Sequence, residues 1–203
     1  LQRKVKELGG LFIPAHIFTP HKSLYGKGVH QSLAEIFDSA LIDAVELGLS
    51  ADTTMASHLS ELDAYPFLTN SDAHSLPKLA REYQQLVLEE PSFQEWKKAL
   101  RGEGGRGIRA NYGLNPYLGK YHETVCENCG EMLEAYEARC PYCGSTQVTK
   151  GVAERINELA DRSSKESKAF RPPYVHHIPL EFLPGLGPKT LDKLVSRFGS
   201  EMA

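Results

Sequence analysis

The sequence contains no stretch that could lie across a membrane, because no run approaches the roughly 20 apolar residues that a spanning helix needs. Residues 1–8 alternate charged and apolar side chains and lack the apolar core of a secretory signal. There is no internal repeat, and a chain of 203 residues that is 41% apolar and 24% charged has ordinary globular composition. We therefore expect a cytoplasmic protein of one large domain or two to three small ones.

Cysteine is scarce, and all four cysteines lie within residues 126–143. They form two Cys-x-x-Cys pairs separated by ten residues, and Gly130 and Gly144 follow the pairs and allow tight turns. Two disulfides or unrelated core cysteines are the alternatives, but paired cysteines in a cytoplasmic chain favour a metal. Four thiolates suit one tetrahedral structural zinc ion with no open position. The predicted zinc ligands are Cys126, Cys129, Cys140 and Cys143.

The first hundred residues alternate apolar runs with amphipathic stretches, which predicts a parallel sheet or a barrel. Strands are expected at residues 11–16, 41–49 and 65–69. Ser32 and Glu35 form a capping box for a helix that places Leu33, Ile36, Phe37 and Ala40 on one face. A second helix is expected at residues 92–100, with Phe93, Trp96, Ala99 and Leu100 facing inward.

The second half of the chain is less regular. The glycine-rich residues 102–107 indicate a domain edge or a flexible loop, and residues 108–125 are expected to be irregular. A helix follows the cysteines, with Val152, Ile156 and Leu159 on its apolar face. We expect three parts: 1–107, the C-terminal part of a barrel; 108–150, a linker and the zinc-binding module; and 151–203, a helical segment.

Three successive predicted strands carry metal-binding side chains near their carboxyl ends. His16 ends the first, Glu46 lies late in the second, and Asp72 and His74 follow the third. In a barrel these ends meet at one rim, where active sites are built. Carboxylate and imidazole ligands suit zinc, manganese or iron. The predicted catalytic metal ligands are therefore His16, Glu46, Asp72 and His74, whereas His21, His30, His58, His176 and His177 are interpreted as structural or solvated.

Residues 183–190, Leu-Pro-Gly-Leu-Gly-Pro-Lys-Thr, resemble the hairpin of a helix-hairpin-helix motif. Two glycines permit a tight turn, and free amides at the start of the following helix can bind a DNA phosphate. An ordinary corner of a small helical bundle is the alternative. The predicted DNA-binding residues are Gly185, Gly187, Lys189 and Thr190.

The pairing of Pro14-Ala15-His16 with Ser71-Asp72-Ala73-His74 resembles the later metal motifs of the polymerase and histidinol phosphatase (PHP) superfamily. The strings 15–20, 23–26, 46–50 and 118–122, and the order of barrel, zinc knuckles and hairpin, resemble its endonuclease Q branch. The resemblance implies an α/β fold: a partial distorted (β/α)7 barrel, a four-cysteine zinc module and a helix-hairpin-helix segment. PHP barrels begin with a His-x-His pair, and none precedes His16, so we expect a fragment of a longer protein that is inactive alone, or a short degenerate homologue.

The resemblance also implies an activity: metal-dependent hydrolysis of DNA on the 5′ side of deoxyuridine, hypoxanthine or an abasic site. The expected cofactors are structural Zn²⁺ and catalytic Zn²⁺, Mn²⁺ or Mg²⁺. The expected partner is lesion-bearing DNA, with no membrane and no inferable protein partner. Tyr112, Tyr117 or Tyr121 could stack on an unstacked base, although packed tyrosines are the simpler interpretation. Three alternatives stay open: a non-catalytic DNA-binding protein, a PHP-type small-molecule phosphatase and an RNA-directed metallohydrolase.

Overall fold

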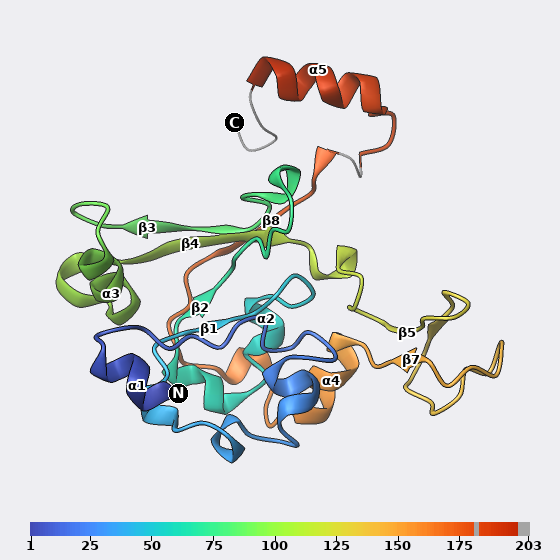
Figure 1. Cartoon of the computed structure of the whole chain (residues 1–203), viewed down its shortest axis with the longest axis horizontal. Coiled ribbons are helices and arrows are strands. Elements are labelled where there is room, and N and C mark those ends of the chain that lie inside the picture. Colours follow the sequence, from blue (N-terminus) through green and yellow to red (C-terminus); the bar gives the residue numbers. More distant parts are fainter. Residues whose placement is uncertain (181–182, 199–203) are drawn as a thin grey trace.

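The computed structural model describes residues 1–180 and 183–198, and it is a mixed α/β structure with three small sheets (Figure 1). The first sheet pairs β1 (Val45–Glu46) with β2 (Phe67–Leu68) in parallel. The second has the order β3-β4-β8, and the third, which carries the cysteines, has the order β6-β5-β7. Within the described residues, no helix is long and apolar enough to cross a membrane.

The segment predicted as the first strand, residues 11–16, is extended and lies beside β1 without forming a regular strand. The amides of Asp43 and Glu46 donate to the carbonyls of Phe12 and Pro14 at 3.0 Å, and just beyond the segment the amide of Ile17 donates to the carbonyl of Glu46 at 2.9 Å. Proline has no N–H to donate, so Pro14 interrupts the ladder. The predicted strands at 41–49 and 65–69 are confirmed only at their centres, as β1 and β2.

The helix predicted from Ser32 is wrong beyond its first turn. The capping box of Ser32 and Glu35 is present, but it starts only the 3-10 turn Leu33–Glu35. The side chain of Glu61 accepts hydrogen bonds from Ser32 Oγ (2.8 Å) and Leu33 N (3.2 Å), which ties this turn to the body of the protein. Asp38 then caps a separate turn, Ser39–Leu41. The local capping signal therefore forms, but the amide of Asp38 donates to the side chain of Gln2 at 3.0 Å rather than to a carbonyl one turn earlier, so the helix does not continue.

The helix predicted at 92–100 is confirmed as α3 (Phe93–Arg101), which Ser92 caps and Gly102 ends in the left-handed conformation. Ala99 and Leu100 are buried as expected, whereas Phe93 is 48% exposed and packs only edge-on against Trp96. The prediction that Phe93 faces inward was therefore wrong.

The irregular structure predicted for residues 108–125 is also wrong in its first part. Strand β4 (Gly107–Leu114) pairs antiparallel with β3 (Tyr83–Val87) and in parallel with β8 (Tyr174–His177). The glycine-rich residues before β4 form only a short turn between α3 and this strand. The sequences of these strands are polar or lack a regular alternation of apolar residues. Pairing with neighbouring strands therefore makes these residues extended, and the pattern of apolar residues does not reveal it.

The four-cysteine module projects from the body as a sheet of β5 (Thr124–Cys126), β6 (Met132–Leu133) and β7 (Val148–Thr149) (Figure 1). Helix α4 (Val152–Leu159) follows it, as predicted, and returns to the body, where Val152 and Ile156 join the main core. That core also contains Ala56 of α2 (Thr53–Ala56), whereas no residue of α1 (Gln2–Glu7) is buried. The packing thus crosses the boundaries expected after residues 107 and 150, which stay predictions.

The segment after α4 is fastened to the body through Asp63. Its carboxylate accepts two hydrogen bonds of 2.6 Å from Arg162 and one of 3.0 Å from Ser167. The guanidinium of Arg171 lies 3.6 Å from the same carboxylate and 3.5 Å above the ring of Phe67. Burial lowers the pKa of Arg171 to about 10, so this cation depends on its carboxylate neighbour.

Replacing Asp63 by Asn should lower the free energy of unfolding by about 2–4 kcal/mol, because it leaves two largely buried cations without their counter-ion. Urea unfolding should show a lower midpoint and an unchanged slope, and Asp192→Asn on the exposed face of α5 (Pro188–Phe198) is the control. Equal midpoints for the two variants would contradict the assignment.

The same contact predicts a pH dependence. Hydrogen bonding from Arg162 holds the pKa of Asp63 below its usual value. A carboxyl with a depressed folded-state pKa stabilises the fold above its unfolded pKa of about 3.9 and loses that contribution as the pH falls through the folded value. The difference in stability between the unmodified protein and Asp63→Asn should therefore be constant near pH 6–7 and shrink below about pH 4.

Candidate metal centres and nucleic-acid interface

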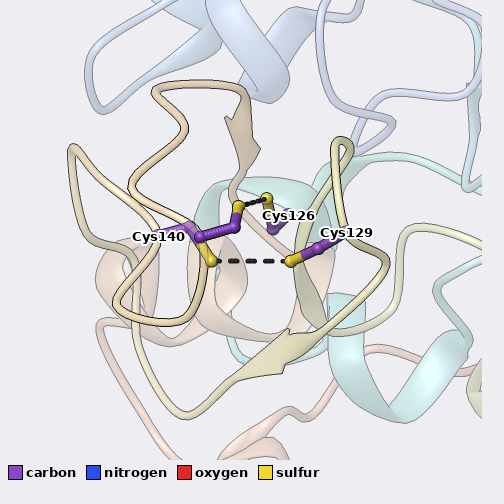
Figure 2. Close-up of side chains that lie close together, drawn as sticks. Cys126, Cys129 and Cys140 are labelled. Carbon is purple, nitrogen blue, oxygen red and sulfur yellow. Dashed lines mark hydrogen bonds between the residues drawn. The ribbon is translucent and has the colours of Figure 1, made fainter.

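The four cysteines meet in one cluster. Their sulfur atoms all lie within 4.8 Å of one another, and two of the Sγ–Sγ distances, Cys126–Cys143 and Cys129–Cys140, are 3.7 Å (Figure 2). A tetrahedral zinc ion with Zn–S bonds of about 2.3 Å requires sulfur atoms about 3.8 Å apart, so the donor set and its spacing fit zinc. No disulfide joins them.

The loops around the sulfurs have the geometry that the glycines predict. Gly130 and Gly144 have φ of 77° and 72°, and each donates its amide to the carbonyl of the first cysteine of its pair at 2.8 Å. The amide of Ser145 and the side chain of Asn128 donate to Cys143 and lower its pKa to about 6. These donors favour the thiolate form of Cys143, which is the form that binds a metal ion.

Glu46 is buried at the end of β1, where it holds the backbone of its neighbours. Its Oε2 accepts from the amide of His16 and its Oε1 from the amide of Gly48 at 2.8 Å, and the His16 imidazole lies 4.0 Å away. Burial, the dominant effect, raises the pKa of Glu46 despite these bonds. A Cβ on Gly48, whose φ is 81°, would lie 3.1 Å from that of His16, so glycine permits this close approach.

Asp72 and His74 lie on an exposed loop after β2. The Nε of Arg81 donates to the carbonyl of Ser71 at 2.6 Å, and its Nη2 donates to that of Asp72 at 3.3 Å. The Nδ1 of His74 lies 2.9 Å from the carbonyl of Asp72. Because a carbonyl only accepts, Nδ1 carries the proton and leaves Nε2 with a free lone pair, as in many metal-binding histidines.

Two of the predicted catalytic ligands have a strained backbone. His16 and Asp72 adopt φ of 34° and 44°, in the left-handed region that non-glycine residues seldom occupy. Such strain persists where the surrounding structure enforces it, and it is concentrated at functional sites. The strain therefore supports a functional role for both loops.

The ligand atoms of the four predicted catalytic residues nevertheless do not all lie close enough together to bind one metal ion. Across residues 1–180 and 183–198, only the four cysteines place three or more His, Cys, Asp or Glu ligand atoms within 4.8 Å of one another. His16 and Glu46 are adjacent, and the charge of Asp72 acts on Glu46, whereas His74 is turned to solvent. The assignment of these four residues to one metal site stays a prediction.

Two polar residues near this site, Glu82 and Tyr174, were not considered in the sequence analysis. Glu82 is 2% exposed, and burial raises its pKa to about 8. Tyr174 has a buried hydroxyl, and His176, interpreted above as structural or solvated, lies 3.0 Å from a carboxylate oxygen of Asp52. Glu82 carries a sequence signal, an acid at the start of the polar strand β3, but its burial depends on β4 and β8.

The predicted hairpin is described only in part, because residues 181–182 lie outside the described residues. Gly185 has φ of 87° and takes the turn that precedes α5, and the amides of Thr190 and Leu191 donate to the carbonyl of Gly187. Within the described residues of α5, none is buried, and the helix lies apart from the sheets (Figure 1). The role of Gly185, Gly187, Lys189 and Thr190 in binding DNA stays a prediction.

The tyrosines considered for base stacking differ in their surroundings. Tyr112 stacks on Tyr83 with ring centroids 4.7 Å apart, and Tyr121 packs near His21 at 5.8 Å. Tyr117 is 76% exposed and leans on His122 at 4.4 Å, at one side of a cavity of about 340 Å³. Of the three tyrosines, only Tyr117 has an aromatic ring that is largely exposed to solvent.

Comparison with known proteins extends over the whole chain. No family model matches it. The uncharacterized protein YqxK of Bacillus subtilis is 61% identical over 203 residues, which cover 100% of this chain and 52% of that protein. The uncharacterized protein MJ0043 of Methanocaldococcus jannaschii is 44% identical over 177 residues, 80% of this chain and 21% of that protein.

Two solved structures share the fold at 40% sequence identity. The lesion-specific endonuclease PfuEndoQ from Pyrococcus furiosus matches with a TM-score of 0.83 over 99% of this chain and 53% of its own. Endonuclease Q in complex with a 27-mer duplex bearing an abasic lesion at the active site matches with a TM-score of 0.87 over 99% of this chain and 54% of its own. This chain spans about half the length of YqxK and of these structures. From this agreement in sequence and fold we conclude that the chain belongs to an endonuclease Q-like family.

Proposed function

We propose that the protein carrying this chain is a metal-dependent DNA repair endonuclease, which hydrolyses the phosphodiester bond on the 5′ side of deoxyuridine, hypoxanthine or an abasic site. The observation that carries this proposal is the match over 99% of the chain to an endonuclease Q bound to abasic-site DNA. A DNA substrate also explains why one chain combines a zinc module with a hairpin, since a small phosphate ester needs neither.

In the proposed site, His16, Asp72 and His74 hold the catalytic metal ions at the rim of a PHP-type barrel. When bound, such ions lower the pKa of a water molecule and neutralise charge on the reacting phosphate. Glu46 uses both oxygens on backbone amides, so we assign it to positioning His16 rather than to direct ligation. Arg81 fixes the loop of Asp72, and the Nδ1–H of His74 orients its ring so that Nε2 is free.

The zinc cysteines and the hairpin have a binding role in the proposal. Cys126, Cys129, Cys140 and Cys143 hold a structural Zn²⁺ that fixes the shape of the module. Gly185, Gly187, Lys189 and Thr190 form a helix-hairpin-helix grip on the DNA backbone, which is not specific for sequence. Lesion choice then depends on unstacking the damaged nucleotide, which is cheapest where pairing is already weakened.

The test uses the full-length protein and end-labelled duplexes that carry one deoxyuridine, one hypoxanthine or one abasic site. We expect a cut on the 5′ side of the lesion in Mn²⁺ or Mg²⁺, none in chelator and none on an undamaged duplex. Binding without cleavage in every metal would instead support the DNA-binding alternative. Hydrolysis of small phosphate esters, or of RNA in preference to DNA, would support the other two.

A further inference from the structure

Strand β8 brings side chains from beyond the zinc module to the sheet beside the candidate catalytic site. In the register, Tyr174 pairs with Asn111, His176 pairs with Gly113, and Tyr83 on β3 pairs with Tyr112. Side chains alternate along a strand, so Tyr174 lies on the same face as Asn111 and Gly113. The side chain of Asn111 donates to the carbonyl of Phe67 on β2 at 3.0 Å. This face is therefore turned toward β1 and β2.

Gly113 leaves a space on this face that two polar groups enter. A Cβ at Gly113 would lie 2.0 Å from the hydroxyl of Tyr174 and 3.0 Å from Oε1 of Glu82. No side chain could be placed there without moving one of them. The hydroxyl of Tyr174 and the carboxyl of Glu82 therefore meet above the backbone of one glycine, although the two residues are 92 positions apart in sequence.

Both groups have an atom without a partner. Oε1 of Glu82 accepts from the amide of Leu114 at 2.9 Å. Within the described residues, Oε2 of Glu82 and the hydroxyl of Tyr174 are buried and make no hydrogen bond. More than nine in ten buried polar groups are paired, and two orphans beside one space point to a buried water that joins them.

The pair lies in the electrostatic surroundings of the candidate site. After burial, the largest influences that raise the pKa of Tyr174 are the charges of Glu82, Asp52 and Glu46. The charge of Glu46 likewise raises the pKa of Glu82. Glu46 in turn accepts hydrogen bonds from the amides of His16 and Gly48, so this electrostatic coupling connects the pair with the loop that carries His16.

We propose that Glu82 and Tyr174 are positioning residues of the endonuclease: one buried water bridges them above Gly113, and together they fix Glu46 and the His16 loop in the geometry that catalysis needs. This inference rests on the proposed function. In this proposal β8 helps to hold the active site in place, so that residues before and after the four-cysteine module contribute to the same site.

The test compares Glu82→Gln, Tyr174→Phe and their combination in the full-length protein. Gln keeps an acceptor for Leu114, and Phe removes only the hydroxyl, so the fold is expected to survive both changes. The matched control is Tyr112→Phe, because Tyr112 lies on the opposite face of β4 from Gly113 and its hydroxyl reaches only Gln85 at 3.5 Å. Cleavage of the abasic duplex gives kcat and KM, and thermal unfolding gives stability.

We expect each single change to lower kcat about tenfold, the usual effect of losing a hydrogen bond in such a network, with KM for DNA and Tm nearly unchanged. The double variant should lose no more than either single variant, because both act through one water. The control should cut normally. Unchanged kcat, multiplied losses in the double variant, or a loss of kcat that follows a loss of Tm would each overturn the proposal.

Two further readouts separate this proposal from the proposed function. If the unmodified protein cuts none of the lesion duplexes, the proposed function fails, and the pair is tested by calorimetric titration with Mn²⁺ alone. Both variants should then bind Mn²⁺ about tenfold more weakly than the control, by the same reasoning. Mn²⁺ affinities equal to that of the control, or no Mn²⁺ binding by any of the proteins, would overturn the inference. A crystal structure should show one ordered water within hydrogen-bonding distance of Glu82 Oε2 and the Tyr174 hydroxyl, and a dry space there would refute it.

Discussion

Replacing Asp72 by Asn should reduce cleavage of an abasic duplex about a thousandfold or more while leaving DNA binding intact. The variant removes one negative charge from the proposed metal site, where charge neutralisation and metal binding carry the chemistry. Asn is the preferred replacement because residue 72 has φ of 44°, a conformation that Asn adopts more readily than Ala. A loss of activity then cannot be attributed to backbone strain.

The measurement is single-turnover cleavage in Mn²⁺, with DNA affinity determined in parallel by fluorescence anisotropy. Glu90→Gln is the control, since Glu90 is exposed and also loses one charge. If Asp72→Asn cuts as fast as the control, Asp72 is not a catalytic ligand and the site must be sought elsewhere. If it loses binding and cleavage together, its role is in holding DNA.

The second large effect concerns the zinc cysteines. Replacing Cys140 and Cys143 by Ser should remove one equivalent of zinc, unfold residues 124–149 and abolish tight DNA binding. We expect the module to unfold without metal. Its strands have two or three residues each, and its core consists of Cys126, Leu133 and Cys140 with Val148 beside them. Metal binding in such modules supplies on the order of 10–16 kcal/mol, far more than this core can.

Zinc content should be measured by atomic absorption, and unfolding by limited proteolysis and hydrogen exchange across the module. Thr146→Ser, an exposed change between the same strands, should keep its zinc and its protection. The thermal transition of the main core should move little, because α4 rather than the module packs against that core. A double-cysteine variant that retains one zinc, or resists protease as the control does, would show that the cysteines are not the ligands.

Sequence reasoning succeeded where the determining contacts are local. Two Cys-x-x-Cys pairs place their sulfurs within a few residues of a turn, and Gly130 and Gly144 permit that turn whatever surrounds it. The capping box at Ser32 and the helices α3 and α4 likewise depend on residues three or four positions apart. The family could be recognised for the same reason, since its motifs are short strings in a fixed order.

Reasoning from sequence failed where the partner is distant along the chain. The helix expected after Ser32 ends after one turn, where the amide of Asp38 bonds to the side chain of Gln2. Residues 108–114 show no clear period and become β4 because β3 and β8 pair with them. Glu82 and Tyr174 were not considered at all. Their surroundings arise only when β8 returns to the sheet.

The sequence by itself therefore determined the cluster of four cysteines, the helices α3 and α4 and the resemblance to endonuclease Q. Each of these follows from neighbours within a turn or from short strings of residues. The tertiary structure alone decided which polar groups are buried together beside the candidate catalytic site. Burial and electrostatic coupling are properties of a three-dimensional neighbourhood, and the strands that build this one are separated by the whole zinc module.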